Sequence, residues 1–492
     1  MFAALGNKTY RLYFAGGAVS NVGAWVQRIG QDWLVLQIGG ATALGITTGL
    51  QFLPFLLLSP LGGMLADRFP KRKILMCTQV ANLTLAAALG ALTLSGHVVT
   101  WHVYVLALLF GISGALDSPA RQSFAIEMVG KDNVANAIGL NSASFNAARL
   151  AGPGIAGLLL VAMGTGMTLL LNALTYAGLF IALMRIRPQD LISPEPITRA
   201  KGAFKEGIAY IRGRSDLVLV MATVGFVAAF GLNMQLTSAL MATEVFGKGA
   251  GEFGVLGSIV AIGTLAGALV AARRKRSRVR LIVVSGLLFS LSLVVAGLMP
   301  TYWTYAAVLP VAGFTSMTMI TAANSIMQLK VEPAMRGRVT SIYMMVFLGS
   351  TPIGSPLVGW IGQEFGARWT LLLGGAISVV GALGASFVLS RSRGLVVRAH
   401  VLPRPHLHVF SEPDYAERLA ELKTREGRLA VRPMSRLLTG GDNYLARITR
   451  SRRGPTPKAP LTAAPAGKAR PLAASREPRS KSATKMSAAL QH

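Results

Sequence analysis

Residues 41–94 read ATALGITTGLQFLPFLLLSPLGGMLADRFPKRKILMCTQVANLTLAAALGALTL. Two long apolar runs flank a turn from Asp67 to Lys73 that holds five charged side chains. A helix needs about 20 apolar residues to cross the hydrocarbon core of a bilayer. The stretch therefore predicts two membrane-spanning helices joined by a charged loop.

The same pattern continues on both sides of this stretch. Hydrophobic residues make up 52% of the 492-residue chain and charged residues only 14%, too little charge to cover the surface of a soluble protein of this length. The sequence predicts an all-α polytopic membrane protein with twelve transmembrane helices. The predicted spans are 10–37, 41–66, 74–95, 101–126, 137–162, 167–186, 215–242, 251–272, 279–299, 303–329, 339–363 and 369–390.

Loop charge predicts the orientation of these spans. The loops on the side of the N-terminus hold 21 Lys and Arg residues, whereas the opposite loops hold only Lys248 and Arg368. Because basic loops stay in the cytoplasm, both termini are predicted to be cytoplasmic. The tail from Arg391 contributes +14 of the net charge of +29. We expect anionic lipids at the basic loops and tail, and no specific nucleic acid.

The chain divides into two halves and a tail. Shifting the first half by 202 residues lays Gly152-Pro-Gly-Ile-Ala-Gly157 on Gly354-Ser-Pro-Leu-Val-Gly359, and parallel six-span repeats are one plan of transporters. A short amphipathic helix is predicted at Phe204–Arg212. The predicted parts are an N-terminal six-helix half (1–186), a cytoplasmic linker (187–214), a C-terminal six-helix half (215–392) and a basic, largely disordered cytoplasmic tail (393–492).

The loop after the second span carries a family resemblance. It reads Gly63-Met-Leu-Ala-Asp67-Arg68-Phe-Pro70-Lys71-Arg72-Lys73. This resembles the signature loop of the major facilitator superfamily, Gly-x-Leu-Ala-Asp-Arg-x-Gly-Arg-(Arg or Lys)-x, with Pro70 in place of Gly and Lys71 in place of Arg. The resemblance implies a latch for the outward-facing state of a transporter. An ordinary basic loop is the alternative. The implied latch residues are Gly63, Asp67, Arg68, Lys71 and Arg72.

The fifth span carries a second resemblance. It contains Ala148-Arg149-Leu-Ala-Gly152-Pro153-Gly154-Ile-Ala156-Gly157, which looks like the Gly-Pro signature of facilitator-superfamily exporters. Small residues let helices approach closely, and a proline bends a helix because it lacks a backbone donor. Gly152, Pro153 and Gly157 are therefore expected to form a helix-packing motif. A generic close-packed, kinked helix is the alternative.

A narrower resemblance lies in spans 1 and 4. The residues that carry it are Arg11 through Asn21, Gly23, Trp25, Gln27, Gln31 and Trp33-Leu-Val in span 1, and Asp117-Ser-Pro-Ala-Arg-Gln122 in span 4. They resemble the enterobactin-exporter-like branch of bacterial facilitators, which includes siderophore exporters and macrolide or multidrug efflux proteins. The resemblance covers residues 8–390. It implies an exporter in the bacterial cytoplasmic (inner) membrane, without assigning its substrate.

Span 1 offers the leading candidate for proton coupling. At 100° per residue, Asn21, Trp25, Arg28 and Asp32 share one face of a helix, which this fold is expected to turn toward a central cavity. Burial favours the protonated carboxyl group and a nearby cation favours the ionised one. We therefore expect Asp32 to exchange protons under the control of Arg28. The alternative is an i,i+4 ion pair that neutralises itself locally and fixes helix packing.

Other polar residues inside the spans are weaker candidates. Asp117 and Arg121 form a second i,i+4 pair, for which a gate or a structural ion pair is favoured. Arg149 is expected to face the cavity or to pair with Asp117 or Asp32. Asn141 is expected to line the cavity or to form an interhelical hydrogen bond.

No cofactor or metal is expected, and no enzymatic role. The sequence has no GxxxxGK[ST] motif for ATP, and its six histidines form no convincing metal set. The favoured function is a secondary transporter that exports a small amphipathic molecule (a drug, siderophore or metabolite) by proton-coupled alternating access. The alternatives are an uptake transporter of the same fold, and a membrane scaffold or receptor that acts through its basic tail.

Overall fold

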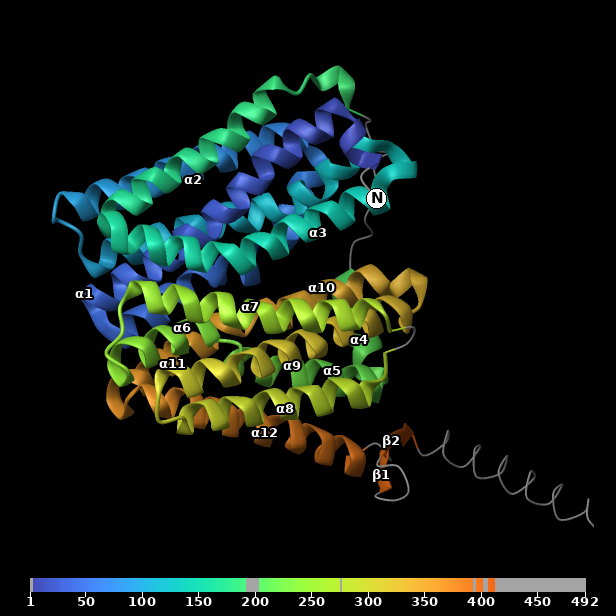
Figure 1. Ribbon diagram of the computed structural model, residues 1–492. Coiled ribbons are helices and arrows are strands. Elements are labelled where there is room, and N and C mark those ends of the chain that lie inside the picture. The colour runs from blue at the N-terminus through green and yellow to red at the C-terminus, as the bar shows by residue number, and fades with distance from the viewer. Residues whose placement is uncertain (1–2, 192–202, 275–276, 393–394, 401–405, 412–492) are drawn as a thin grey trace, which may run out of the picture. The chain divides into compact units, whose positions relative to one another are not determined.

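The computed structural model describes residues 3–191, 203–274, 277–392, 395–400 and 406–411. All of them belong to the compact unit Met1–Arg418, and the second unit, Leu419–His492, lies outside the described residues. Long helices lie side by side (Figure 1). The elements are η1 (Ala3–Gly6), α1 (Lys8–Arg68), α2 (Lys71–Leu94), α3 (Thr100–Arg185), η2 (Pro188–Asp190), α4 (Ala203–Gly213), α5 (Ser215–Phe226), the π-helical η3 (Val227–Gly231), α6 (Met234–Leu240), the π-helical η4 (Met241–Val245), α7 (Ala250–Ala272), α8 (Val279–Leu298), α9 (Tyr302–Leu329), α10 (Pro333–Gly349), α11 (Thr351–Phe365), α12 (Ala367–Ser392), β1 (Leu395–His400) and β2 (His406–Ser411).

The helices confirm the predicted membrane-spanning architecture. In the described part of the chain, ten helical stretches are long and apolar enough to cross a membrane. Two of them, Lys8–Leu58 and Asn133–Arg185, contain 51 and 53 residues. Each is broken by a glycine with positive φ, Gly40 at 71° and Gly164 at 74°, a conformation that glycine adopts without steric cost. Each stretch is therefore two spans, which gives the twelve spans predicted from the sequence.

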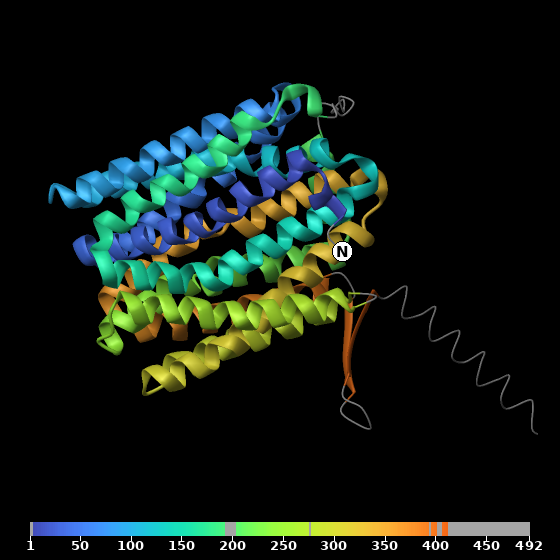
Figure 2. The ribbon, with the colours of Figure 1, turned by 45° about the horizontal axis from the view of Figure 1, so that its top comes forward.

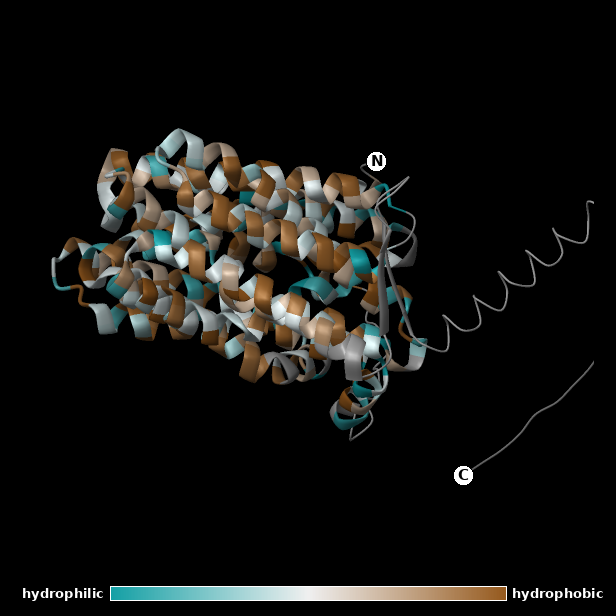
Figure 3. Cartoon of the chain, turned by 90° about the horizontal axis from the view of Figure 1, so that it is seen from below, coloured by the Kyte–Doolittle hydropathy of each residue, from teal (hydrophilic) through white to brown (hydrophobic). Residues whose placement is uncertain are grey.

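The outer faces of the helices are suited to lipid. Large apolar side chains stand exposed on them, among them Leu158 and Trp303, each at 72% of full exposure. Figure 3 shows hydrophobic residues along the spans, with hydrophilic residues more frequent near their ends. Such continuous apolar surface is rare on soluble monomers and marks contact with a membrane or a partner. Here it belongs to helices of spanning length.

The seventh span is irregular. It runs through α5, η3, α6 and η4, and the helix is interrupted at 232–233. The side-chain Nδ2 of Asn233 donates to the carbonyl of Ala229 at 2.7 Å, within one turn of the break. π-Helical turns are frequent at functional sites, and this span also lines the cavity described below. The sequence predicts a regular helix here.

Glycines bring the first six spans into contact with the last six. A Cβ added to Gly254 of α7 would lie 2.4 Å from the carbonyl oxygen of Pro153 and 2.9 Å from the Cα of Gly157, both in α3. A Cβ added to Gly45 of α1 would likewise lie 3.0 Å from the Cα of Gly359 in α11. Figure 1 shows α1 to α3 on one side and α7 to α12 on the other, and in the turned view of Figure 2 the two sets partly overlap.

The two contacts follow the repeat seen in the sequence. Gly157 and Gly359, which align under the shift of 202 residues, each meet a glycine of the opposite six spans. Gly152 has a different neighbour, because a Cβ there would lie 2.5 Å from the Cβ of Trp25. The motif in the fifth span therefore packs on both α1 and α7.

The linker contains the predicted helix, and the chain after α12 contains strands. Helix α4 (Ala203–Gly213) confirms the expected segment, and its Glu206 pairs with Arg338 of α10. Strands β1 and β2 form an antiparallel hairpin with Leu395 opposite Ser411. Runs such as Leu395–Val397 favour strands, although the sequence analysis predicted no strand in 393–492. Residues 412–492 of that predicted tail lie outside the described residues.

Candidate functional site

A cavity of about 160 Å³ lies between the first six and the last six spans. Its wall comes from α1, α3, α7, α9 and the irregular seventh span. The lining residues are Trp25, Arg28, Ile29, Arg149, Pro153, Leu232, Met234, Gln235, Ser238, Phe253, Gly257, Val260, Thr264, Ser316, Met317 and Ile320. Arg149 and Ser316 lie halfway along their spans, so the cavity is near the middle of the bundle, where transporters of this architecture bind substrate.

Arg28 and Asp32 do not close the ion pair that their spacing suggested. Arg28 lines the cavity, whereas Asp32 lies behind the wall at 3% exposure. Among the described residues no ion pair joins them. The Arg28 guanidinium instead lies 5.1 Å from the ring centroid of Phe52, and its Nε is buried without a hydrogen-bond partner. The expected local neutralisation by a contact ion pair is therefore wrong for this conformation.

The Asp32 carboxyl group nevertheless lies within the electrostatic reach of both halves. Arg28, one helical turn away, acts on it through charge, and Gln235 of the seventh span lies next to it. Gln235 also lines the cavity. The carboxyl group thus stands at the boundary between the two sets of six spans, where a change of its charge acts on both.

Arg149 faces the cavity, and no carboxylate of the described residues pairs with it. It lines the wall from α3, and the described residues contain no ion pair from it to Asp117 or Asp32. Of the positions that the sequence analysis considered for Arg149, the structure selects the cavity.

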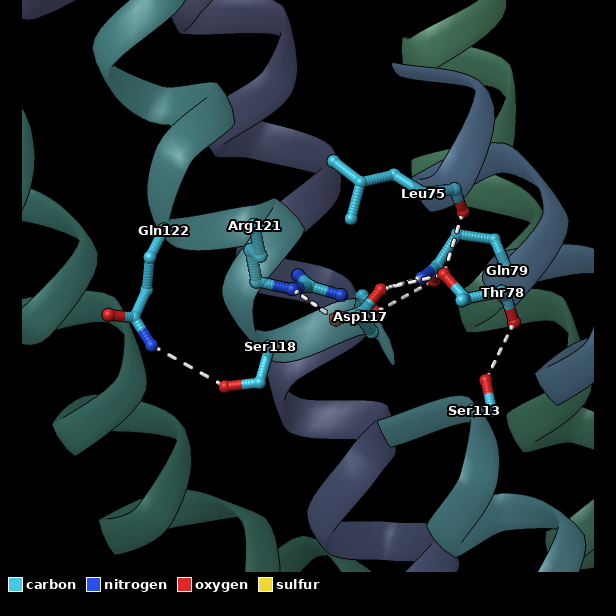
Figure 4. A network of polar contacts seen from close by, with 9 residues as sticks. Leu75, Thr78, Gln79, Ser113, Asp117, Ser118, Arg121 and Gln122 are labelled. Atoms are coloured by element: carbon cyan, nitrogen blue, oxygen red, sulfur yellow. Dashed lines mark hydrogen bonds and ion pairs between the residues drawn. The ribbon is translucent and has the colours of Figure 1, made fainter. Parts of the chain in front are cut away.

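Asp117 belongs to a closed polar network (Figure 4). Its Oδ2 accepts from the Nε of Arg121 at 2.7 Å, and its Oδ1 accepts from Thr78 Oγ1 at 2.8 Å and Gln79 Nε2 at 3.1 Å. Both carboxylate oxygens are therefore engaged, within α2 and α3 of the first six spans. This geometry favours a structural ion pair.

Asn21 and Asn141 connect spans 1 and 5. The Nδ2 of Asn21 donates to the Oγ of Ser144 at 3.1 Å, and the Oδ1 of Asn141 accepts from the Tyr10 hydroxyl at 3.3 Å. Neither residue lines the cavity, so both are better explained as interhelical hydrogen bonds. Trp25, from the same predicted face of span 1, does line the cavity.

The basic loop at 63–73 is anchored within the first six spans. Lys71 pairs with Glu127 of α3 at 2.6 Å. The Nε of Arg72 donates to the carbonyl of Leu183 at 2.7 Å, near the C-terminal end of α3, where a cation interacts favourably with the helix dipole. Arg68 is exposed, and the side chain of Asp67 lies outside the described part. The latch role of Gly63, Asp67 and this loop remains a prediction.

Sequence reasoning missed most of the wall that the last six spans contribute. Ser238, Phe253, Thr264 and Ser316 all line the cavity. Phe253 gave no signal of its own, and the signal of the Ser and Thr residues was weak because their hydroxyls bond to carbonyls of their own helix. Thr264 and Ser316 do so at 2.9 Å.

Comparisons with known proteins identify the family of the chain and support its fold. A profile of the family described as transmembrane secretion effector matches residues 1–431, beyond the 8–390 covered by the motifs. The chain is 27% identical over 376 residues to the staphyloferrin A transporter of Staphylococcus aureus, across 75% of this chain and 93% of that protein. It is 25% identical over 352 residues to the multidrug efflux pump Tap of Mycolicibacterium fortuitum, across 69% and 86%. It is 26% identical over 314 residues to the enterobactin exporter EntS of Shigella boydii, across 61% and 72%.

Solved structures support the fold. A bacterial homolog of the human lysosomal transporter Spinster, in an inward-facing and unoccupied conformation, superposes with a TM-score of 0.63 at 16% identity, over 78% of this chain and 97% of that one. A D-xylose-proton symporter superposes with a TM-score of 0.60 at 15% identity, over the same shares. At such identities the likeness concerns the fold alone.

Proposed function

The chain belongs to the transmembrane secretion effector family of the major facilitator superfamily, and we propose that it exports a small amphipathic molecule from a bacterial cell. It is a multi-pass membrane transporter and not an enzyme. Relatives named for export or efflux act on a siderophore or on drugs. The mid-bundle cavity, with aromatic, aliphatic and cationic side chains in one wall, is the observation that carries the proposal.

Proton coupling through Asp32 is the second part of the proposal. The carboxyl group is almost fully buried on span 1, near Arg28 and next to Gln235 of the seventh span. Ionisable groups inside membrane proteins are costly and mark functional sites. Proton binding removes a charge at the boundary between the two six-helix halves. Such a change alters the relative stability of the inward-open and outward-open states, so that protons enter the cell as substrate leaves it.

Sidedness follows from the loop charge, with both termini in the cytoplasm of a bacterial cytoplasmic membrane. The tight Gly157–Gly254 and Gly45–Gly359 contacts lie toward the ends marked by Gly164 and Gly40. In this orientation those ends face outward. The structure then corresponds to a state closed toward the outside.

A cysteine-labelling experiment tests the orientation. Cys77 is the single cysteine, so Cys77→Ser provides a cysteine-free background. In intact cells an impermeant maleimide is expected to label Ser95→Cys, between α2 and α3, and to leave Ser277→Cys, between α7 and α8, unlabelled until the membrane is permeabilised. The reverse pattern would contradict cytoplasmic termini.

Efflux from cells tests the function itself. Cells that express the chain are loaded with a panel of fluorescent amphipathic dyes and antibiotics and then energised, with and without a protonophore. We expect at least one compound to leave faster than from vector-only cells, and the protonophore to remove the difference. Faster accumulation would favour uptake by the same fold. Function lost on deletion of 394–492, with no effect of changes in span 1, would favour a scaffold or receptor that acts through its tail.

A further inference from the structure

The cavity has an unbalanced positive charge. Its wall contains two arginines, Arg28 and Arg149, and none of the described residues that line it is Asp or Glu. A buried charge without a partner is costly in a medium of low dielectric. A counter-anion within the cavity would remove that cost.

The two arginines differ in their surroundings. Arg28 lies one turn from Asp32, which acts on it through charge, and its guanidinium covers the ring of Phe52. Arg149 has neither, because the described residues provide it with no ion pair and no hydrogen bond. Of the two arginines in the wall, Arg149 is therefore the one whose charge the described residues leave unmatched.

The hydroxyl groups of the wall do not compete for an anion at Arg149. Ser316 and Thr264 donate to carbonyls of their own helices, and Ser238 shares a hydrogen bond with Tyr305 at 3.2 Å. Trp25 and Phe253 present aromatic surface, and Ile320 is aliphatic. An occupant would meet the guanidinium groups of Arg149 and Arg28, the amide of Gln235 and a broad apolar surface.

We propose that the cavity binds an organic anion, with its anionic oxygen group on Arg149 and its apolar body against Trp25, Phe253 and Ile320. This inference deepens the proposed export function and rests on it. A guanidinium binds carboxylates and related oxyanions through a planar pair of N–H donors. The anionic group lies at Arg149 rather than Arg28, because ionised Asp32 beside Arg28 repels it.

A matched pair of dyes tests the inference. Rhodamine B carries a free carboxylate, and its ethyl ester has the same ring system with that group blocked. Binding of each dye is measured by fluorescence polarisation on the purified full-length protein in lipid nanodiscs, for the wild type, Arg149→Gln and Arg149→Lys. Arg187→Gln, which changes an exposed cation outside the cavity, is the matched control.

We expect the wild type and the control to bind the carboxylate dye more tightly than the ester. Arg149→Gln should weaken carboxylate binding by roughly 10- to 100-fold, the size expected for a lost charge-assisted hydrogen bond, and should not weaken binding of the ester, whose ring system is cationic. Arg149→Lys should keep part of the preference. Equal binding of both dyes by the wild type, binding of neither, or a preference that survives Arg149→Gln would overturn the inference.

Transport of the same dyes in proteoliposomes separates this inference from the proposed function. Selective binding of the carboxylate dye without transport would contradict the export function and support the anion site. Transport of both dyes at equal rates would support the export function and contradict the anion site.

Discussion

Replacing Asp32 with Asn should abolish export driven by a proton gradient and leave substrate exchange across the membrane intact. Asn matches the carboxylate in shape but does not bind or release a proton. Gradient-driven export requires that proton step, whereas exchange requires only substrate binding and the movement of the two halves. The measurement is made in proteoliposomes, with an imposed pH gradient in one arm and substrate on both sides in the other. Gradient-driven transport should fall to the level of empty liposomes.

Three further variants distinguish a role of Asp32 in proton coupling from a role in helix packing. Asp32→Glu should retain gradient-driven export, because it keeps a titratable group. Asp117→Asn is the matched control, since Asp117 is also a carboxylate in the first six spans but is fully engaged by Arg121, Thr78 and Gln79. The double change Arg28→Gln/Asp32→Asn removes both charges of span 1. It should restore exchange if the single variant loses it only because Arg28 is left unmatched.

Two outcomes would contradict the role of Asp32. Gradient-driven export that survives Asp32→Asn and disappears in Asp117→Asn would transfer the coupling to the polar network of Figure 4. Loss of exchange and of folded protein in every Asp32 variant would support the alternative interpretation, in which this carboxylate only fixes the packing of span 1.

The sequence predicts the spans well because membrane insertion depends on local properties. Length and hydropathy alone locate helices such as Val279–Leu298, which was predicted at 279–299. The turns within α1 and α3 are also local, since Gly40 and Gly164 each lie in a short gap between two apolar runs. The small residues of the fifth span likewise predicted close helix packing, which the structure shows against α7.

Features that depend on distant segments were not predictable in the same way. Lys71 pairs with Glu127 across 56 positions of the sequence, a separation that no helical spacing suggests. The i,i+4 rule placed Arg28 beside Asp32, but the ring of Phe52 in the next span holds the guanidinium instead. Tertiary contacts decide both of these cases. The break at 232–233 was not predicted either, because the residues of the seventh span alone read as a regular apolar helix.

The contact between Gly157 and Gly254 yields a prediction about the conformational cycle. A methyl group at Gly254 would lie 2.4 Å from the carbonyl oxygen of Pro153, so the closed contact does not admit even Gly254→Ala without separation of α3 from α7. The state open at this end has no such contact. Overpacking typically costs about 1–3 kcal/mol, which corresponds to a population shift of about 5- to 150-fold toward the open state.

Labelling of the cavity from outside measures that shift. In the Cys77→Ser background, Ser316→Cys places a single thiol in the cavity wall. With Gly254→Ala, an impermeant maleimide applied outside should label this thiol several-fold to about 100-fold faster, following the population shift. Gly178→Ala is the matched control, because a Cβ at Gly178 of α3 would meet nothing within 4 Å. Equal labelling rates in the two variants would mean that this glycine contact does not close the outward path, and that closure depends on other contacts such as Gly45–Gly359.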